Sequence, residues 1–246
     1  MPSAPFRTLD DVVNGLSALE SDLRDRQDRR CMFLTLYRVV SSEMRSQVEA
    51  GAFDDPEWVH RYAVAFANLY RDAFDAYEAG QRGQVPKAWL LCFDAAAAGR
   101  TLVLQNVFLG VNAHVNHDLA YALFGVSIDP DRARRYRDHS AVNRVLGSVT
   151  ERATTQLASL YAPGLTALDD CAGELDEMLS MFSLEIARES AWESALGLAN
   201  ARADQLRHHA ALDFAARIVC GRLEQGTPWT TLLAAIAADG GARRVV

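Results

Sequence analysis

The sequence predicts an all-α protein, a single domain of about eight to ten helices that covers residues 1–246. Apolar residues recur at intervals of three and four along nearly the whole chain, as one face of an α-helix requires, and strand-like alternation is scarce. Half of the residues are hydrophobic, which is enough for a sizeable core. Only the ends, at 1–7 and 239–246, are expected to be disordered.

Capping residues predict the helix boundaries in the first part of the chain. The hydroxyl of Thr8 can cap a first helix, and a second helix covers about 31–48. Asp54 or Asp55 can cap the third helix, because Pro56 directly follows and suits a first helical turn.

The later helices are separated by glycine and proline. Pro86 starts a helix that breaks near Gly99, and a long apolar helix follows over about 101–124. A further helix opens at Asp129, and the region 165–224 is strongly helical. No linker divides the chain into two domains.

The composition excludes several classes of protein. The net charge is −7, from 25 basic and 32 acidic residues, which suits a soluble protein and argues against a nucleic-acid partner. The four cysteines have neither disulfide nor zinc-site spacing. No secretory signal and no membrane span is visible, so a cytoplasmic location is expected. The oligomeric state is left open, and a homodimer is compatible with the sequence.

The long apolar helix contains a polar segment, Gly110-Val-Asn-Ala-His-Val-Asn-His-Asp-Leu119. At about 100° per residue, two imidazoles, a carboxylate and a phenol share one helix face. These residues are His114, His117, Asp118 and Tyr121. Asn112 and Asn116 fall on the opposite side. A helix with polar groups on two sides is expected to run through the middle of the fold.

Three interpretations of this segment stay open. His114, His117 and Asp118 can be ligands of a divalent metal such as Zn or Fe. They can instead do acid–base work, with the carboxylate holding one imidazole in a single tautomer. In the third interpretation they are buried polar groups that tie helices together.

Other helices supply further candidate residues. Glu189 stands in a row of glutamates at four-residue spacing, so it is either a general base or part of a solvated acidic edge. His139 and Asn143 follow Asp138 and are candidate binding residues. Trp89 and Trp192 indicate an aromatic pocket wall or ordinary core.

The chain resembles the bacterial and archaeal domain-of-unknown-function family numbered 5995. The resemblance rests on the polar segment above and, more weakly, on Val85-Pro-Lys-Ala-Trp89, Asp138-His-Ser-Ala-Val-Asn143 and Ala187-Arg-Glu-Ser-Ala-Trp192. An aromatic residue usually precedes the aspartate in that family, whereas His117 stands there in this chain. His114-xxx-Asp118 is also similar to the HxxxD of the all-helical zinc-dependent phospholipase C and single-strand nuclease superfamily, which implies zinc.

These observations lead to two functional hypotheses. In the first, the protein is a small-molecule enzyme of specialised metabolism that uses His114, His117, Asp118 and Glu189 on a hydrophobic substrate. Hydrolase, lyase, cyclase and oxygenase chemistry are not distinguished by the sequence. In the second, the protein is a non-catalytic helical module that binds a ligand or a partner, and the polar cluster is structural.

Overall fold

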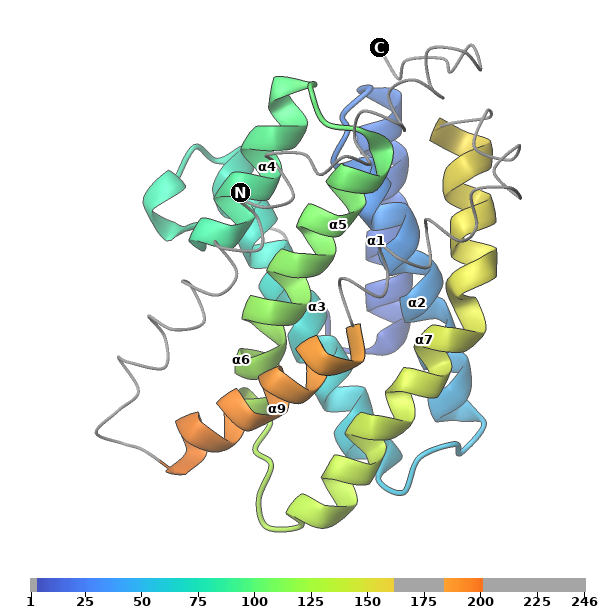
Figure 1. Ribbon diagram of the computed structural model, residues 1–246, viewed down its shortest axis with the longest axis vertical. Helices are drawn as coiled ribbons and strands as arrows, with labels where there is room; N and C mark the ends of the chain where they lie inside the picture. The colour runs from blue at the N-terminus through green and yellow to red at the C-terminus, as the bar shows by residue number, and fades with distance from the viewer. Residues whose placement is uncertain (1–3, 162–183, 201–246) are drawn as a thin grey trace.

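The computed structural model describes residues 4–161 and 184–200, and it confirms the all-α prediction because these residues contain no strand (Figure 1). The helices are α1 (Leu9–Asp25), α2 (Cys31–Glu49), α3 (Pro56–Glu78), α4 (Lys87–Ala98), α5 (Val103–Ala113), α6 (Leu119–Gly125), α7 (Arg132–Tyr161) and α9 (Leu184–Asn200). A 3-10 turn (Arg82–Gln84) precedes α4, and a π-helical turn (His114–Asp118) joins α5 to α6. The helices predicted within 162–183 and beyond residue 200 lie outside the described residues.

The capping residues hold the helix ends as predicted. The Thr8 hydroxyl accepts a hydrogen bond from the Asp11 amide at 3.1 Å, and the Asp11 carboxylate accepts one from the Thr8 amide at 3.0 Å. The second of the two candidate aspartates caps α3, since the Asp55 carboxylate accepts from the Trp58 amide at 3.1 Å. Gly99 ends α4 in the left-handed conformation, with φ of 68°, which a residue with a side chain rarely adopts.

The rod formed by α5, the π-helical turn and α6 runs through the middle of the fold, as expected for a helix with polar groups on two sides (Figure 1). α2 and α4 pack against its α5 end, whereas α3 and α9 pack against its α6 end. α7 lies along α2, and α1 covers α2 from the other side. The π-helical turn itself contacts α3 and α9 as well as the two helices that it joins.

Gly110 allows α5 to approach α2 closely. A Cβ atom at this position would lie 2.5 Å from the ring of Phe33, much closer than real side chains come. The absence of a side chain at Gly110 lets the aromatic ring occupy that space, and it brings α2 within reach of the polar segment.

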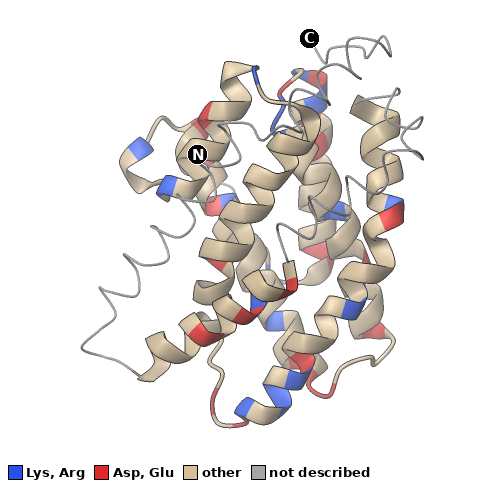
Figure 2. Cartoon of the chain, viewed as in Figure 1, with Lys and Arg blue, Asp and Glu red and all other residues tan. Residues whose placement is uncertain are grey.

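Apolar side chains form two main clusters that are joined into one core through Val48 and Val111. Charged residues lie on other helices and on the loops, and α5 carries none (Figure 2). At the N-terminal end of α7, basic and acidic side chains lie side by side, as in the pair of Arg137 with Asp54 at 2.9 Å. None of the helices in the described part of the chain is long and apolar enough to cross a membrane.

Candidate functional site

Three N–H groups converge on the carboxylate of Asp118. Trp89 Nε1 donates to Oδ2 at 2.8 Å, His114 Nδ1 lies 3.0 Å from the same oxygen, and His117 Nδ1 lies 2.8 Å from Oδ1. Asp118 is only 1% exposed. We call these four residues the Asp118 cluster. The structure thus brings together the two histidines and the aspartate that the sequence placed on one face, and adds Trp89 from α4.

A π-helical turn carries the cluster, where the sequence predicted an uninterrupted α-helix. The Leu119 amide donates to the carbonyl of His114, five residues back, instead of four. Such turns occur mostly as single insertions in α-helices and are frequent at functional sites.

The charges in the cluster follow from burial and hydrogen bonding. Burial alone would raise the pKa of Asp118, but the hydrogen bonds from His114 and His117 hold the pKa of that carboxyl below its usual value. Burial lowers the pKa of His114 and outweighs the opposing effect of Asp118. An ionised Asp118 therefore accepts from Nδ1 of a neutral His114, so the other nitrogen, Nε2, carries a free lone pair.

His114 lines a cavity, and its buried Nε2 is unpartnered among the described residues. The cavity has a volume of about 190 Å³, and no other described residue with a buried, unpartnered polar atom lines it. Its imidazole ring stacks on Phe66 with centroids 3.4 Å apart, and the Tyr37 ring lies edge-on at 4.5 Å. The imidazole is thus held by stacking on Phe66, by the edge-on Tyr37 ring and by Asp118 at Nδ1, whereas Nε2 has no partner among the described residues.

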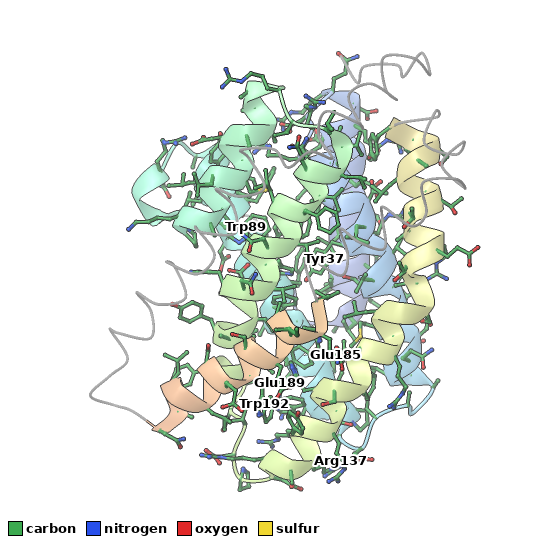
Figure 3. The ribbon with its side chains drawn as sticks, viewed as in Figure 1. Tyr37, Trp89, Arg137, Glu185, Glu189 and Trp192 are labelled. Carbon is green, nitrogen blue, oxygen red and sulfur yellow. The ribbon has the colours of Figure 1, made fainter. Side chains whose placement is uncertain are left out.

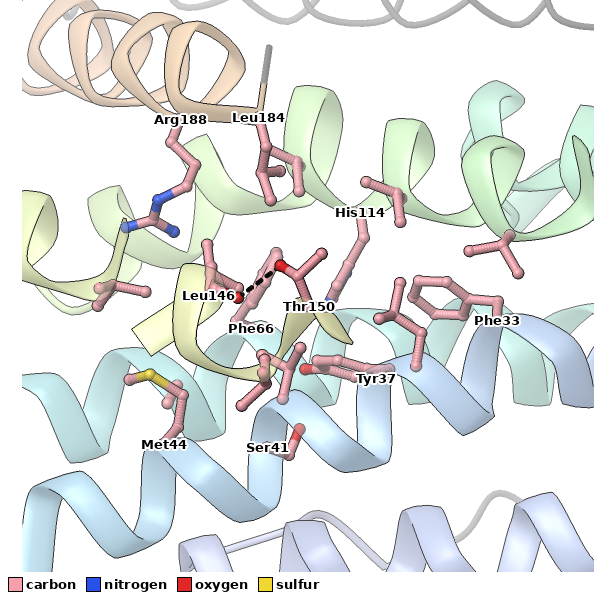
Figure 4. A pocket seen from close by; sticks show the side chains of 18 of the residues that line it. Phe33, Tyr37, Ser41, Met44, Phe66, His114, Leu146, Thr150, Leu184 and Arg188 are labelled. Atoms are coloured by element: carbon pink, nitrogen blue, oxygen red, sulfur yellow. Dashed lines mark hydrogen bonds between the residues drawn. The ribbon is translucent and has the colours of Figure 1, made fainter. Parts of the chain in front are cut away.

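The cavity lies between α2, α3, α5, α7 and α9, and its wall is mainly apolar (Figure 4). In the close view, Arg188 enters from α9 at one end, Phe33 lies at the other, and His114 stands between them. Sequence reasoning missed Tyr37, Phe66 and Arg188 as site residues. Arg188 did carry a signal, because it is the one cation within an otherwise apolar and acidic helix segment, Leu184–Asn200.

A second polar group, the α7 cluster, consists of Asp138, His139, Asn143 and Arg188. Asp138 accepts from the backbone amides of Asp54 and Asp55, both at 2.7 Å, and so fastens the loop before α3 to α7. His139 Nε2 donates to the Arg188 carbonyl at 3.1 Å. The Arg188 guanidinium in turn donates to Asn143 Oδ1 at 2.7 Å and to the His139 carbonyl at 2.6 Å. The predicted candidates His139 and Asn143 therefore join α7 to α9 and do not line the cavity.

The candidates on α9 lie apart from the Asp118 cluster. Glu189 accepts from the Tyr136 hydroxyl at 3.0 Å and is not part of the cavity wall. Trp192 is 3% exposed and packs against His139, with ring centroids 5.3 Å apart. Figure 3 shows Glu189 and Trp192 along α9, with Trp89 beside the central rod.

The remaining predicted residues lie around the rod. Asn116 Nδ2 donates to Asn112 Oδ1 at 2.8 Å on the side opposite the histidines, as the helical spacing predicted. The Tyr121 ring lies 5.0 Å from that of His117. None of these residues lines the cavity.

The described residues fit a metal poorly. No three side chains of His, Cys, Asp or Glu within residues 4–161 and 184–200 gather closely enough to hold a metal ion. Both oxygens of Asp118 accept N–H donors, so this carboxylate orients the two imidazoles, and the metal interpretation with Zn or Fe stays a prediction.

A family model matches most of the chain. A model of a family of unknown function (DUF5995) matches residues 9–222, a range that contains the Asp118 cluster, the α7 cluster and the cavity wall. No curated protein and no solved structure matches the chain.

Proposed function

The chain belongs to this family of unknown function, and we propose from its site that the protein is an enzyme that moves a proton on a small, largely apolar molecule. His114 is the proposed general base, and the cavity is the proposed substrate site. One observation carries the proposal: His114 lines the cavity, and its buried Nε2 has no partner among the described residues, while Asp118 fixes Nδ1.

The proposed step is a proton transfer within the cavity. The lone pair on Nε2 takes a proton from an O–H or activated C–H group of the bound molecule, and the ring becomes an imidazolium. The electron pair of the broken bond stays on the substrate, and Nε2 later returns the proton. The charge of Asp118 stabilises the imidazolium, as a carboxylate does behind a catalytic histidine, and sets the tautomer in which Nε2 is the acceptor.

The surroundings support this step. Phe66 and Tyr37 hold the imidazole ring in place and exclude water from it. His117 and Trp89 neutralise part of the buried charge of Asp118 by hydrogen bonding, which keeps the carboxylate ionised. An apolar cavity with few polar groups favours a hydrophobic substrate. A cytoplasmic location and a homodimer stay predictions beside this proposal.

A search for turnover tests the proposal. Purified protein is incubated with a fractionated extract of small molecules, and mass spectrometry identifies compounds that are consumed or formed. We expect a conversion that wild-type protein performs and His114→Gln does not. His60→Gln is the matched control, because His60 lies on α3 and outside the cavity wall.

Three results would count against the proposal. Equal conversion by wild-type protein and His114→Gln would remove His114 from the chemistry. A stoichiometric metal in protein purified without chelator or histidine tag, lost in His114→Gln, would instead favour the metal interpretation with Zn or Fe. Ligand binding without any conversion would favour the non-catalytic module.

A further inference from the structure

Arg188 is a buried cation whose partners in the described part of the chain are all neutral. It is 4% exposed, and its guanidinium donates to the Asn143 side chain and to the His139 carbonyl. Its remaining contact is His139 Nδ1, at 3.3 Å. No carboxylate of the described residues forms an ion pair with it, although α9 carries acidic residues on its exposed side.

The other buried arginines of the described residues pair with carboxylates. Arg30 is 8% exposed and pairs with Asp28 at 2.5 Å and with Glu78 at 2.7 Å. Arg71 is 9% exposed and pairs with Asp72 at 2.5 Å. A buried charge without an opposite charge is costly, and Arg188 is the buried arginine that has no carboxylate partner within residues 4–161 and 184–200.

The position of Arg188 indicates which kind of molecule supplies its counter-ion. The side chain lines the same cavity as His114, at the end opposite Phe33 (Figure 4). The wall near it is formed by aliphatic side chains such as Val142, Leu146 and Leu184. A molecule in this cavity meets one positive end and an apolar remainder.

We propose that the cavity binds a small monocarboxylate, with its carboxylate on Arg188 and its apolar body along the wall toward His114. Arginine is suited to this role because its planar fork matches the two oxygens of a carboxylate. Polyanions such as nucleotides are disfavoured, since the wall offers no second cation among the described lining residues. The inference rests on the proposed function, because the carboxylate on Arg188 would hold the reacting part of the substrate against Nε2.

The cavity volume limits the size of the ligand. At about 190 Å³ it is somewhat larger than a cavity of roughly 150 Å³ that accommodates benzene, so the ligand has roughly 8–12 non-hydrogen atoms. Octanoate has this size and a single negative charge. Octanamide and octylamine have nearly the same shape with no charge and a positive charge, respectively.

Calorimetric titration of the full chain with these three probes tests the inference at neutral pH. We expect octanoate to bind at least about tenfold more tightly than octanamide, and octylamine to bind most weakly, because only the carboxylate supplies the missing counter-ion. In Arg188→Gln the affinity for octanoate should fall to that for octanamide. Arg152→Gln is the matched control, since Arg152 is an exposed arginine of α7 outside the cavity wall.

Two further variants locate the binding and keep the test sharp if Arg188→Gln does not fold. Arg188→Lys should retain part of the preference for octanoate over octanamide. Leu146→Trp fills the cavity from α7 and should weaken binding of octanoate and octanamide alike. Octanoate affinity that is unchanged in Leu146→Trp would place the binding elsewhere and overturn the inference.

The outcomes separate this inference from the proposed function. Equal affinity for octanoate and octanamide, tighter binding of octylamine, or no binding of octanoate at millimolar concentration would overturn the carboxylate site and leave His114 as a base untouched. Conversely, a carboxylate preference that persists in His114→Gln, together with turnover unaffected by that substitution, would retain the site and refute the proposed base.

Discussion

The Asp118 cluster and the α7 cluster both place an aspartate beside histidine, but they differ in whether a histidine keeps an unpartnered ring nitrogen. In the α7 cluster, both oxygens of Asp138 and both ring nitrogens of His139 have partners in the protein. In the Asp118 cluster, the carboxylate is equally well satisfied, but His114 keeps one nitrogen free beside a cavity. The difference teaches that a histidine next to an aspartate indicates chemistry only where one nitrogen remains open to a ligand.

The largest expected difference between the clusters concerns turnover. Asp118→Asn places an amide N–H among three N–H donors, so His114 is driven to the other tautomer and Nε2 no longer accepts a proton. We expect turnover to fall by roughly 10²–10⁴-fold while the domain stays folded, as measured by steady-state kinetics and circular dichroism. The same substitution in the α7 cluster, Asp138→Asn, should leave the turnover of folded protein nearly unchanged. Similar losses in both variants would contradict the contrast drawn above.

Stability should show the reverse contrast. Asp138→Ala removes a charged acceptor from two backbone amides that fasten the loop before α3, and we expect the free energy of unfolding to fall by roughly 2–4 kcal/mol. Chemical denaturation measures this loss. Glu151→Ala, an exposed substitution on the same helix, should change the free energy by less than about 0.5 kcal/mol. A loss in Asp138→Ala no larger than in this control would mean that the α7 cluster is not a structural fastening.

The pH dependence of stability should also depend on the α7 cluster. Burial and the nearby charge of Arg188 lower the pKa of His139 to about 3. The unfolded chain takes up this proton near pH 6.5, so the free energy of unfolding decreases as the pH falls from that value toward the folded pKa. This amounts to roughly 2 kcal/mol between about pH 7 and pH 5 for His139 alone.

Denaturant unfolding at several pH values measures this decrease, and His139→Asn should make it shallower. His114, whose pKa is also lowered by burial, accounts for the slope that remains. An unchanged slope in His139→Asn would show that another group controls the acid sensitivity of the fold.

The smallest expected effect lies on the other side of the central rod. Asn116→Ala removes a partly buried hydrogen bond to Asn112 and should reduce the free energy of unfolding by roughly 0.5–1.5 kcal/mol. Turnover should be unaffected, because neither asparagine lines the cavity. A loss of turnover comparable to that in Asp118→Asn would extend the site to this face of the rod.

Local chemistry explains what could be predicted from the sequence. Helix ends depend on residues within one turn, so they can be predicted from neighbouring positions in the sequence. The caps at Thr8 and Asp55 and the break at Gly99 are examples. The meeting of His114 with Asp118 follows in the same way from a four-residue spacing.

The cavity could not be predicted, because its wall combines residues from helices far apart in the chain. Tyr37 and Phe66 reach His114 from α2 and α3, and the sequence offers no spacing that links them. The role of His139 was likewise undetermined, since its partner Arg188 lies 49 positions away. The predicted Glu189 remained ambiguous because only the fold reveals that its carboxylate is bonded to Tyr136.

The π-helical turn also fixes the phase of the rod. One additional residue in a helix rotates everything after it by about 100° about the axis, and the wide turn absorbs that rotation. Deleting Val115 would convert the rod into a continuous α-helix of nearly the same length and would leave the apolar face of α6 directed toward α3 and α9. The turn thus accommodates one more residue beside Asp118 without changing the neighbours of α6. A relative with a one-residue deletion between His114 and Asp118 is therefore expected to keep the packing of α6 against α9.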